Sequence, residues 1–418
     1  MRFDLLIRGG RVVDPSAGYD GQLDVAIKRD RIAAVDREIP SSSAFVVIDA
    51  TDRIVTPGLV DLHAHVFHGV TYWGIHADAF APRTGVTTWV DAGSAGALTL
   101  GGFREFVIDR ARVRIVPFLN ISCIGLVSEN YELSRLEHVD VDLFRRVVDQ
   151  NRDLVVGVKV RMGTPIVGEQ GIEPMRRART AADECELPLM VHVSIAPPSI
   201  REVLELMRPG DILTHCFTGL TMKIVDDEGH LHDFAKRAWD EGVIMDIGHG
   251  AGSFSFEVAE ALLAAGHRPD VISTDAHQLS VRGPMFDLPT CMSKFLALGL
   301  TLPDVVRAAT SRPAEVLGRD GELGTLRPGG RADVAILTLH RGLFPFYDIH
   351  GTVREGAELL RCAQTILNGK PLEPIPLPPP APWVDPLWPP LQAEFAEKQR
   401  RLHELGHYPD AMAAAAQP

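Results

Sequence analysis

Short apolar runs alternate with helix-like stretches through most of this 418-residue chain, and this alternation is the feature that most limits its fold. Between Gly58 and about Arg319, eight runs have the length of buried strands, and stretches of helical period such as GIEPMRRARTAADECE lie between several of them. The runs are LVDLH, VTTWVDA, RIVPFLN, LVVGVKV, LPLMVHV, DILTH, VIMDIG and DVISTDA. Eight strands in a repeated βα order predict a (β/α)8 TIM barrel, with an open doubly wound sheet as the alternative.

The two ends of the chain have a different pattern. Short apolar runs broken by Gly, Asp and Pro fill the first fifty-odd residues. The segments GELGTLRPGGRADVAILTL and CAQTILNGKPL, which follow the barrel, have the same pattern of short strands and glycine turns. We therefore expect residues 1–56 and 321–372 to form one small β-sandwich domain, and residues 57–320 to form the barrel. Residues 373–418 are proline-rich and then helix-like, which predicts a C-terminal extension.

Composition excludes several classes of function. A formal net charge of −13 argues against a generic nucleic-acid binder. No secretory signal or 18-residue apolar stretch is present, and the five cysteines form no CxxC pair, so we expect a cytoplasmic protein without a membrane partner. The extension carries Trp383 and Trp388, which we expect to pack on this chain's own domain or on a neighbouring subunit. Its apolar residues predict a homo-oligomer.

The segment GLVDLHAHVFHG places His63 and His65 one residue apart at the end of the first barrel run. Residues i and i+2 of a strand point to the same face, so the two imidazoles should converge. Barrel active sites lie at the C-terminal ends of the strands. The pair therefore lies where an active site is expected. Two histidines buried in the core by chance, or a surface patch, are the alternatives for this segment.

Polar residues interrupt or end four other runs, namely Lys159, His192, His215 and Asp275. Each alone has an ordinary explanation, such as a hydrogen-bonded core histidine, a snorkelling lysine or a helix N-cap. Together they would bury four imidazoles, an ammonium and a carboxylate, which is unfavourable unless they pair or bind metal. Imidazole and carboxylate are suitable ligands for zinc and similar ions, so the set predicts a centre of two divalent metals.

Lysine needs a separate explanation, because an ammonium does not bind a cation. Valines flank Lys159 on both sides, and desolvation lowers the pKa of a lysine and favours the neutral amine. A neutral amine can add carbon dioxide to give an anionic carbamate, whose two oxygens can bridge two metals. The alternative is a charged Lys159 that replaces the second metal.

The six positions resemble those of the amidohydrolase superfamily, and the segments TPGLVDLHAHVFHG, HRPDVISTDAH and RPGGRADVAIL are similar to its strand-one, strand-eight and post-barrel signatures. Within it, GVTTWVDAGSAG, VGVKVRM, LTHCFTG and IMDIGHGAGSFSF resemble the amidohydrolase/deacetylase metallohydrolase branch, which is dihydroorotase-like. The resemblance extends to about Glu373.

This resemblance implies a binuclear zinc centre, with manganese as the alternative. His63, His65 and Asp275 would hold one metal and His192 and His215 the other. Carboxylated Lys159 and a hydroxide nucleophile would bridge them. Asp275 would also serve as the general acid and base.

The implied reaction is hydrolysis of an ester or amide, removing an acyl or acetyl group from a small carboxylate-bearing substrate. Two alternatives share the same metal ligands: a cyclic amide or imide hydrolase, like dihydroorotase or dihydropyrimidinase, and an N-acyl amino acid hydrolase. A scaffold without activity is the non-enzymatic alternative, but scaffold relatives have lost metal ligands and here every ligand position is filled.

Three further residues are candidates for substrate binding. Arg161 shares a strand face with Lys159 and could hold a substrate carboxylate, or form a salt bridge with a loop acid. His249 lies among glycines that let backbone N–H groups approach a ligand. Tyr72 follows the first strand and could donate a hydrogen bond to the substrate carbonyl, or simply pack.

Overall fold

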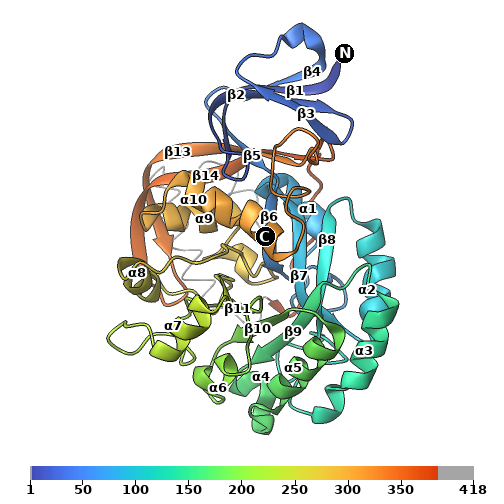
Figure 1. Ribbon diagram of the computed structural model, residues 1–418, viewed down its shortest axis with the longest axis vertical. Coiled ribbons are helices and arrows are strands. Elements are labelled where there is room, and N and C mark those ends of the chain that lie inside the picture. The colour runs from blue at the N-terminus through green and yellow to red at the C-terminus, as the bar shows by residue number, and fades with distance from the viewer. Residues whose placement is uncertain (1, 385–418) are drawn as a thin grey trace.

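The computed structural model describes residues 2–384, and Figure 1 shows a barrel with helices on its outside and a small β unit at one end. Met1 and residues 385–418 are outside the described part. The predicted helix of the extension and Trp388 therefore lie outside the described residues. Trp383 is described, and it packs on Tyr72 of its own chain. Among residues 2–384, no helix is both long enough and apolar enough to cross a membrane.

Seven parallel strands form most of the barrel wall, in chain order from β6 to β12. They are β6 (Leu59–Ala64), β7 (Val86–Gly96), β8 (Arg114–Asn120), β9 (Gly157–Met162), β10 (Leu189–Val193), β11 (Ile212–Thr214) and β12 (Ile244–Asp246). The eighth predicted run closes the ring without forming a regular strand. It makes one parallel bridge to β12, between Asp246 and Val271, and one to β6, between Ala64 and Ala276. The predicted barrel is thus confirmed.

The irregularity of the eighth segment has a local cause. The backbone N–H of Thr274 donates to Asp61 Oδ1 at 3.0 Å, and the Thr274 hydroxyl donates to Asp61 Oδ2. A carboxylate therefore takes the place of a neighbouring strand's carbonyl. The next residue, Asp275, has a φ of +50°, which turns the chain out of the extended conformation.

Helices cover the outside of the barrel (Figure 1). They are α1 (Ala77–Thr84), α2 (Leu100–Phe106), α3 (Val141–Gln150), α4 (Thr164–Val167), α5 (Glu173–Cys185), α6 (Ile200–Leu204), α7 (Asp233–Asp240), α8 (Phe256–Ala264), α9 (Leu288–Ala297), α10 (Leu302–Ala308) and α11 (Ser311–Val316). Side-chain caps fix several of the starts. Asp140 accepts from Leu143 N before α3, and Ser199 and Thr301 form capping boxes before α6 and α10.

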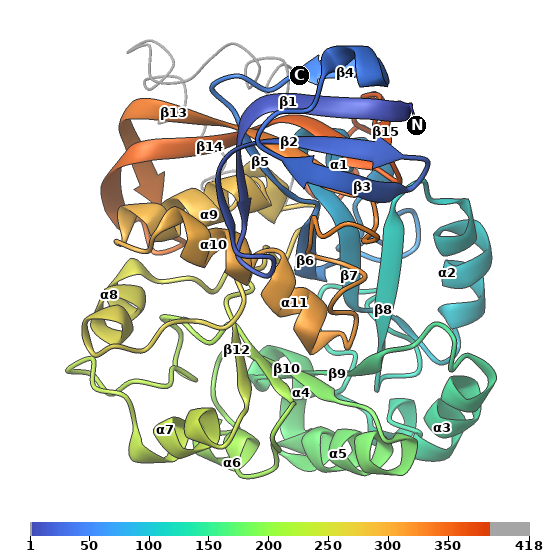
Figure 2. The same cartoon turned by 45° about the horizontal axis from the view of Figure 1, so that its top comes forward.

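Strands from both ends of the chain form a second sheet, which Figure 2 shows as blue and orange strands side by side. The strands are β1 (Phe3–Asp14), β2 (Tyr19–Lys28), β3 (Arg31–Asp36), β4 (Ala44–Asp49), β5 (Ile54–Pro57), β13 (Val334–Tyr347), β14 (Val353–Leu367) and β15 (Lys370–Pro371). The join is antiparallel, with Val334 of β13 opposite Pro57 of β5. The boundaries at residues 56, 320 and 372 stay a prediction.

The inner faces of several strands change from apolar to polar toward their C-terminal ends. An inner apolar cluster contains Met190, Ile212, Ile244 and Val271. Two residues later, on the same face of each segment, stand His192, Thr214, Asp246 and Ser273. The apolar residues fill the lower barrel, and the polar residues lie together above them.

We predict that Asp61→Ala lowers the free energy of unfolding by about 3 kcal/mol, because it leaves the buried Thr274 donors without an acceptor. Urea denaturation of chelator-treated protein measures this. The control is Asp227→Ala, whose side chain is 93% exposed, and it should change stability by less than about 0.5 kcal/mol. Equal small changes in the two variants would show that Asp61 does not hold the barrel closed.

Candidate metal centre

His63 and His65 lie at the C-terminal end of β6, and both turn Nε2 toward Asp275. Oδ1 of Asp275 is 3.3 Å from Nε2 of His63 and 3.2 Å from Nε2 of His65. The ligand atoms of these three residues all lie within 4.8 Å of one another, close enough to hold one metal ion. All three side chains are buried.

The other three predicted residues lie against this group. Lys159, on β9, places Nζ 3.4 Å from His63 Nε2. His215 Nε2 is 2.8 Å from His192 Nδ1 and 3.9 Å from Asp275 Oδ2. The structure therefore brings all six sequence-predicted positions together at one end of the barrel.

Burial keeps the four imidazoles neutral. Desolvation lowers the pKa of His63, His65 and His192 well below the usual value, and lowers the pKa of His215 to about 4. Neutral imidazole is the form of histidine that binds metal. The site is therefore ready to bind a cation near neutral pH without first losing protons from histidine.

Partners behind the imidazoles decide which nitrogen faces the centre. His215 Nδ1 is 2.5 Å from the carbonyl of Gly248, which can only accept, so Nδ1 carries the proton and Nε2 the lone pair. The hydroxyl of Thr214 donates to Asp246 at 2.7 Å, so its oxygen accepts from His63 Nδ1, also at 2.7 Å. Such outer partners orient ligand imidazoles in metal sites.

His65 is held by the strand next to it. Its Nδ1 lies 3.0 Å from Ser94 Oγ. Asp91 accepts from the backbone N–H groups of Ser94 at 2.7 Å and Val66 at 2.9 Å, which ties the end of β7 to the segment just after His65. Burial raises the pKa of Asp91 to about 6.

Two glycines leave the room that the site needs. A Cβ on Gly248, whose φ is +44°, would lie 2.3 Å from Thr214 Oγ1 and 3.0 Å from Nδ1 of both His63 and His215. A Cβ on Gly93 would lie 2.5 Å from Lys159 Cβ. Any larger residue at these two positions would clash with the side chains of the centre, and this lack of space is the reason for glycine there.

The donor set fits a divalent metal because acceptor atoms face one another. The lone pair of His63 Nε2 points toward Asp275 Oδ1, and no hydrogen is available between them. His215 Nε2 also lies 2.8 Å from His192 Nδ1, a contact that either one imidazole proton or a cation can satisfy. A cation would turn these contacts into coordination bonds, and nitrogen and carboxylate donors suit zinc or manganese.

Lys159 is fully buried, and desolvation lowers the pKa of its amine to about 7. A substantial neutral fraction therefore exists at neutral pH, as carbamate formation requires. The neighbouring Arg161 opposes protonation of the same amine.

Arg161 lies next to the centre and contacts a loop acid. Its Nη1 is 3.4 Å from Oε1 of the fully buried Glu132 and donates to the carbonyl of Glu129 at 3.3 Å. Its guanidinium carbon also lies 5.9 Å from the centroid of the Trp73 ring. The predicted salt bridge with a loop acid is therefore present. Arg161 has further N–H donors, so its binding of a substrate carboxylate stays a prediction.

His249 and Tyr72 differ in what they can offer a substrate. His249 Nδ1 donates to the Gly250 carbonyl at 2.9 Å, and its Nε2 lies 2.6 Å from Lys294 Nζ, so both nitrogens have partners within the protein. A substrate would have to displace one of them. For Tyr72, burial and then the charge of Glu129 raise the pKa to about 12, which keeps the phenol protonated as a donor.

Three acids behind the candidate metal ligands were not among the predicted site residues. Asp61, Asp91 and Asp246 are buried, and each interrupts an apolar run: VDLH, WVDA and IMDIG. The burial argument used for the histidines applies equally to these acids and would have found them. His277, with Nε2 3.8 Å from Asp275 Oδ2, also belongs to the neighbourhood.

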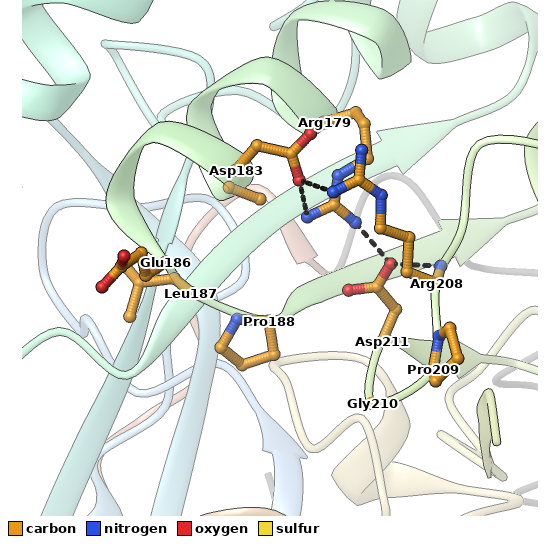
Figure 3. Close-up of a pocket in the computed structure, with 10 residues that line it drawn as sticks. Arg179, Asp183, Glu186, Leu187, Pro188, Arg208, Pro209, Gly210 and Asp211 are labelled. Atoms are coloured by element: carbon orange, nitrogen blue, oxygen red, sulfur yellow. Dashed lines mark hydrogen bonds and ion pairs between the residues drawn. The ribbon is translucent and has the colours of Figure 1, made fainter.

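A cavity of about 370 Å³ lies elsewhere, and Figure 3 shows two of its arginines, Arg179 and Arg208, paired with Asp183 and Asp211. Asp183 accepts a hydrogen bond from Arg208 at 2.6 Å, and Asp211 accepts one from Arg179 at 2.5 Å. Asp211 immediately precedes β11, which places the cavity at the N-terminal ends of the strands. Barrel chemistry belongs to the opposite end, where the histidine cluster lies.

A model of the amidohydrolase family matches residues 54–372. The chain belongs to this family. It is 41% identical over 319 residues to the deacetylase Atu3266 of Agrobacterium fabrum, covering 76% of this chain and 78% of that protein. It is 35% identical over 373 residues to a deacetylase of Enterococcus faecalis, covering 88% and 99%.

Two solved structures are similar along nearly their whole length. Crystal structures of an adenine deaminase and a dihydroorotase are 35% and 36% identical to this chain, each with a TM-score of 0.81. They cover 88% and 90% of this chain, which covers 99% of each. Together with family membership, these relatives identify the protein as a metal-dependent hydrolase.

We predict that Thr214→Val weakens metal binding by about 10- to 100-fold, because His63 Nδ1 loses the acceptor that directs Nε2 to the centre. Metal content after dialysis against graded chelator measures this. Thr180→Val, on the exposed side of α5, is the matched control and should retain metal like the wild type. Equal retention in both variants would mean that the Thr214 relay does not set the affinity.

Proposed function

We propose that this protein is a binuclear hydrolase that removes an acyl group, such as acetyl, from a small ester or amide bearing a carboxylate. The observation that carries the proposal is the convergence of His63, His65, His192, His215 and Asp275 with the buried Lys159. The deacetylases of 35–41% identity support removal of an acetyl group.

His63, His65 and Asp275 would hold one divalent ion, and His192 and His215 the other. Lys159, carrying carbon dioxide as a carbamate, would lie between them. Zinc is the expected metal and manganese the alternative. When bound, the ions would polarise the substrate carbonyl and acidify the attacking water.

Asp275 would move the proton. Its Oδ1 faces His63 and His65, while Oδ2 lies 3.8 Å from His277 Nε2. A Cβ on Gly250 would come within 2.6 Å of Oδ2, so glycine keeps this oxygen accessible. Oδ2 is therefore the atom placed to take a proton from the attacking water and return it to the leaving group.

Substrate orientation would come from the residues around the centre. The phenol of Tyr72 would donate to the substrate carbonyl oxygen. Arg161 would hold the carboxylate, with Glu132 and Glu129 fixing the position of its guanidinium. His249 would shape the wall through its contacts with Gly250 and Lys294 and would not bind substrate directly.

A second candidate function is hydrolysis of a cyclic amide or imide, favoured by the 36% identity to a dihydroorotase of known structure. The metal ligands do not separate the two functions. Acetyl esters of α-hydroxy acids, N-acyl amino acids and cyclic imides should be assayed side by side on protein loaded with zinc or manganese. We expect turnover of the acyl substrates. Turnover of the cyclic imides alone would replace the first proposal with the second.

We predict that Asp275→Asn lowers kcat by about 10³-fold or more, because an amide cannot take the proton. Steady-state kinetics and metal analysis should be run together, since the amide oxygen still offers a ligand atom. Asp240→Asn, exposed on α7, is the control and should match the wild type. A kcat within tenfold of the wild type in Asp275→Asn would exclude the proton-transfer role.

We predict that Arg161→Met raises KM about 10- to 100-fold for carboxylate-bearing esters and much less for neutral esters. Because this change leaves Glu132 buried without its cation, the double variant Arg161→Met/Glu132→Gln should be measured beside it. The double variant removes the stray charge and should show the same selectivity. Equal effects on charged and neutral esters in both variants would argue against a carboxylate clamp.

A further inference from the structure

The last described residues run from the small β sheet toward the metal centre, and we call residues 373–384 the strap. At its start, the carbonyl of Glu373 accepts from Arg112 Nη2 at 3.3 Å. Six of its twelve residues are proline, which favours an extended chain rising ~3.1 Å per residue, or roughly 30 Å from Glu373 to Trp383. The strap can therefore run from the N-terminal end of β8 to the loop that follows β6.

The strap ends on the loop that carries Tyr72. The indole N–H of Trp383 donates to the Tyr72 carbonyl at 3.2 Å, and the two ring centroids are 6.1 Å apart with an interplanar angle of 30°. Val384, the next residue, is fully buried. Trp383 thus contacts both the backbone and the ring of Tyr72, a predicted substrate-binding residue.

From Tyr72 the contacts continue to the reaction centre. The rings of Tyr72 and Trp73 meet edge to face at 4.8 Å, and Trp73 meets His277 in the same way at 4.7 Å. Trp73 also lies beside the Arg161 guanidinium. A row of aromatic rings therefore joins the strap to the groups proposed to bind and cleave the substrate.

The loop between β6 and α1 is held beside Tyr72 by the Thr71 hydroxyl, which donates to the Phe67 carbonyl at 2.8 Å, and by Ile75 N, which donates to the His65 carbonyl at 2.9 Å. It has no regular secondary structure between Val66 and His76, and Val70 is 51% exposed. Gln278 holds its far side, donating from its backbone to the Trp73 carbonyl at 3.0 Å and from its side chain to that of Gly74 at 2.7 Å. On the near side, Tyr72 N donates to the Leu126 carbonyl, and Trp383 adds the contact from outside the barrel.

We propose that Trp383 is a positioning residue for the substrate: by holding Tyr72, it keeps Trp73 against Arg161 and His277, so the strap completes the substrate site. The family match ends at residue 372, so Trp383 lies beyond the part of the chain that the family model covers. Without Trp383, substrate binding would have to order the loop, which weakens binding but leaves the chemical step intact. This inference rests on the proposed function only where KM and kcat are measured, because those measurements need a substrate.

The test compares Trp383→Ala and Trp383→Phe with the wild-type full-length protein. Trp383→Ala loses a ring contact and a hydrogen bond, so KM should rise about tenfold while kcat stays within about twofold. Trp383→Phe keeps a ring and should show a smaller rise, about threefold. Phe45→Ala, which removes an aromatic ring that is 62% exposed on β4, is the control and should behave as wild type. An unchanged KM in Trp383→Ala, or a loss of activity that only follows a loss of metal, would overturn the proposal.

A second measurement needs no turnover. Chymotrypsin cleaves after Tyr and Trp, so the rate of cleavage after Tyr72 and Trp73, followed by mass spectrometry, reports how firmly the loop is held. Trp383→Ala should be cleaved about tenfold faster than the wild type, and Phe45→Ala at the wild-type rate. Equal rates in all three proteins would overturn the positioning role. If the wild type hydrolyses none of the substrates but the loop is protected as expected, the proposed function fails and the structural inference stands.

Discussion

Acceptor atoms meet acceptor atoms at the centre of this barrel, and the rest of the account depends on that contact. The Gly248 carbonyl and the Thr214 hydroxyl fix the protons of His215 and His63 on Nδ1, so their Nε2 lone pairs point inward. There His63 Nε2 faces the carboxylate oxygen Oδ1 of Asp275 at 3.3 Å. Between side chains this deeply buried, such a contact is unfavourable by itself, and a cation makes it favourable.

The barrel supplies the order that such a site requires. Apolar side chains fill the lower interior, and two residues further along the same faces come His192, Thr214, Asp246 and Ser273. Ser273 and Thr214 both donate to Asp246, at 2.6 Å and 2.7 Å, which links three neighbouring segments behind His63. Positions at the ends of rigid strands, or directly after them, hold side chains more accurately than long loops do.

The alternation of eight apolar runs with helical stretches was enough to predict the barrel, and it predicted the convergence of the six polar positions because these lie toward the ends of five of the runs. It did not predict the irregular eighth segment, since the carboxylate of Asp61 replaces a strand partner there. It also gave no sign of the partners of His249, because Lys294 lies on a helix 45 residues further along the chain. The contact of Trp383 with Tyr72 spans 311 residues, and no local pattern reveals such a pair.

Zinc anomalous scattering from crystals of the zinc-loaded protein would show directly whether two ions bind at this centre. The account predicts two peaks, one among His63, His65 and Asp275 and one beside His192 and His215, with additional density on Lys159 Nζ between them. An unmodified Lys159 with no peak among these residues would contradict the account.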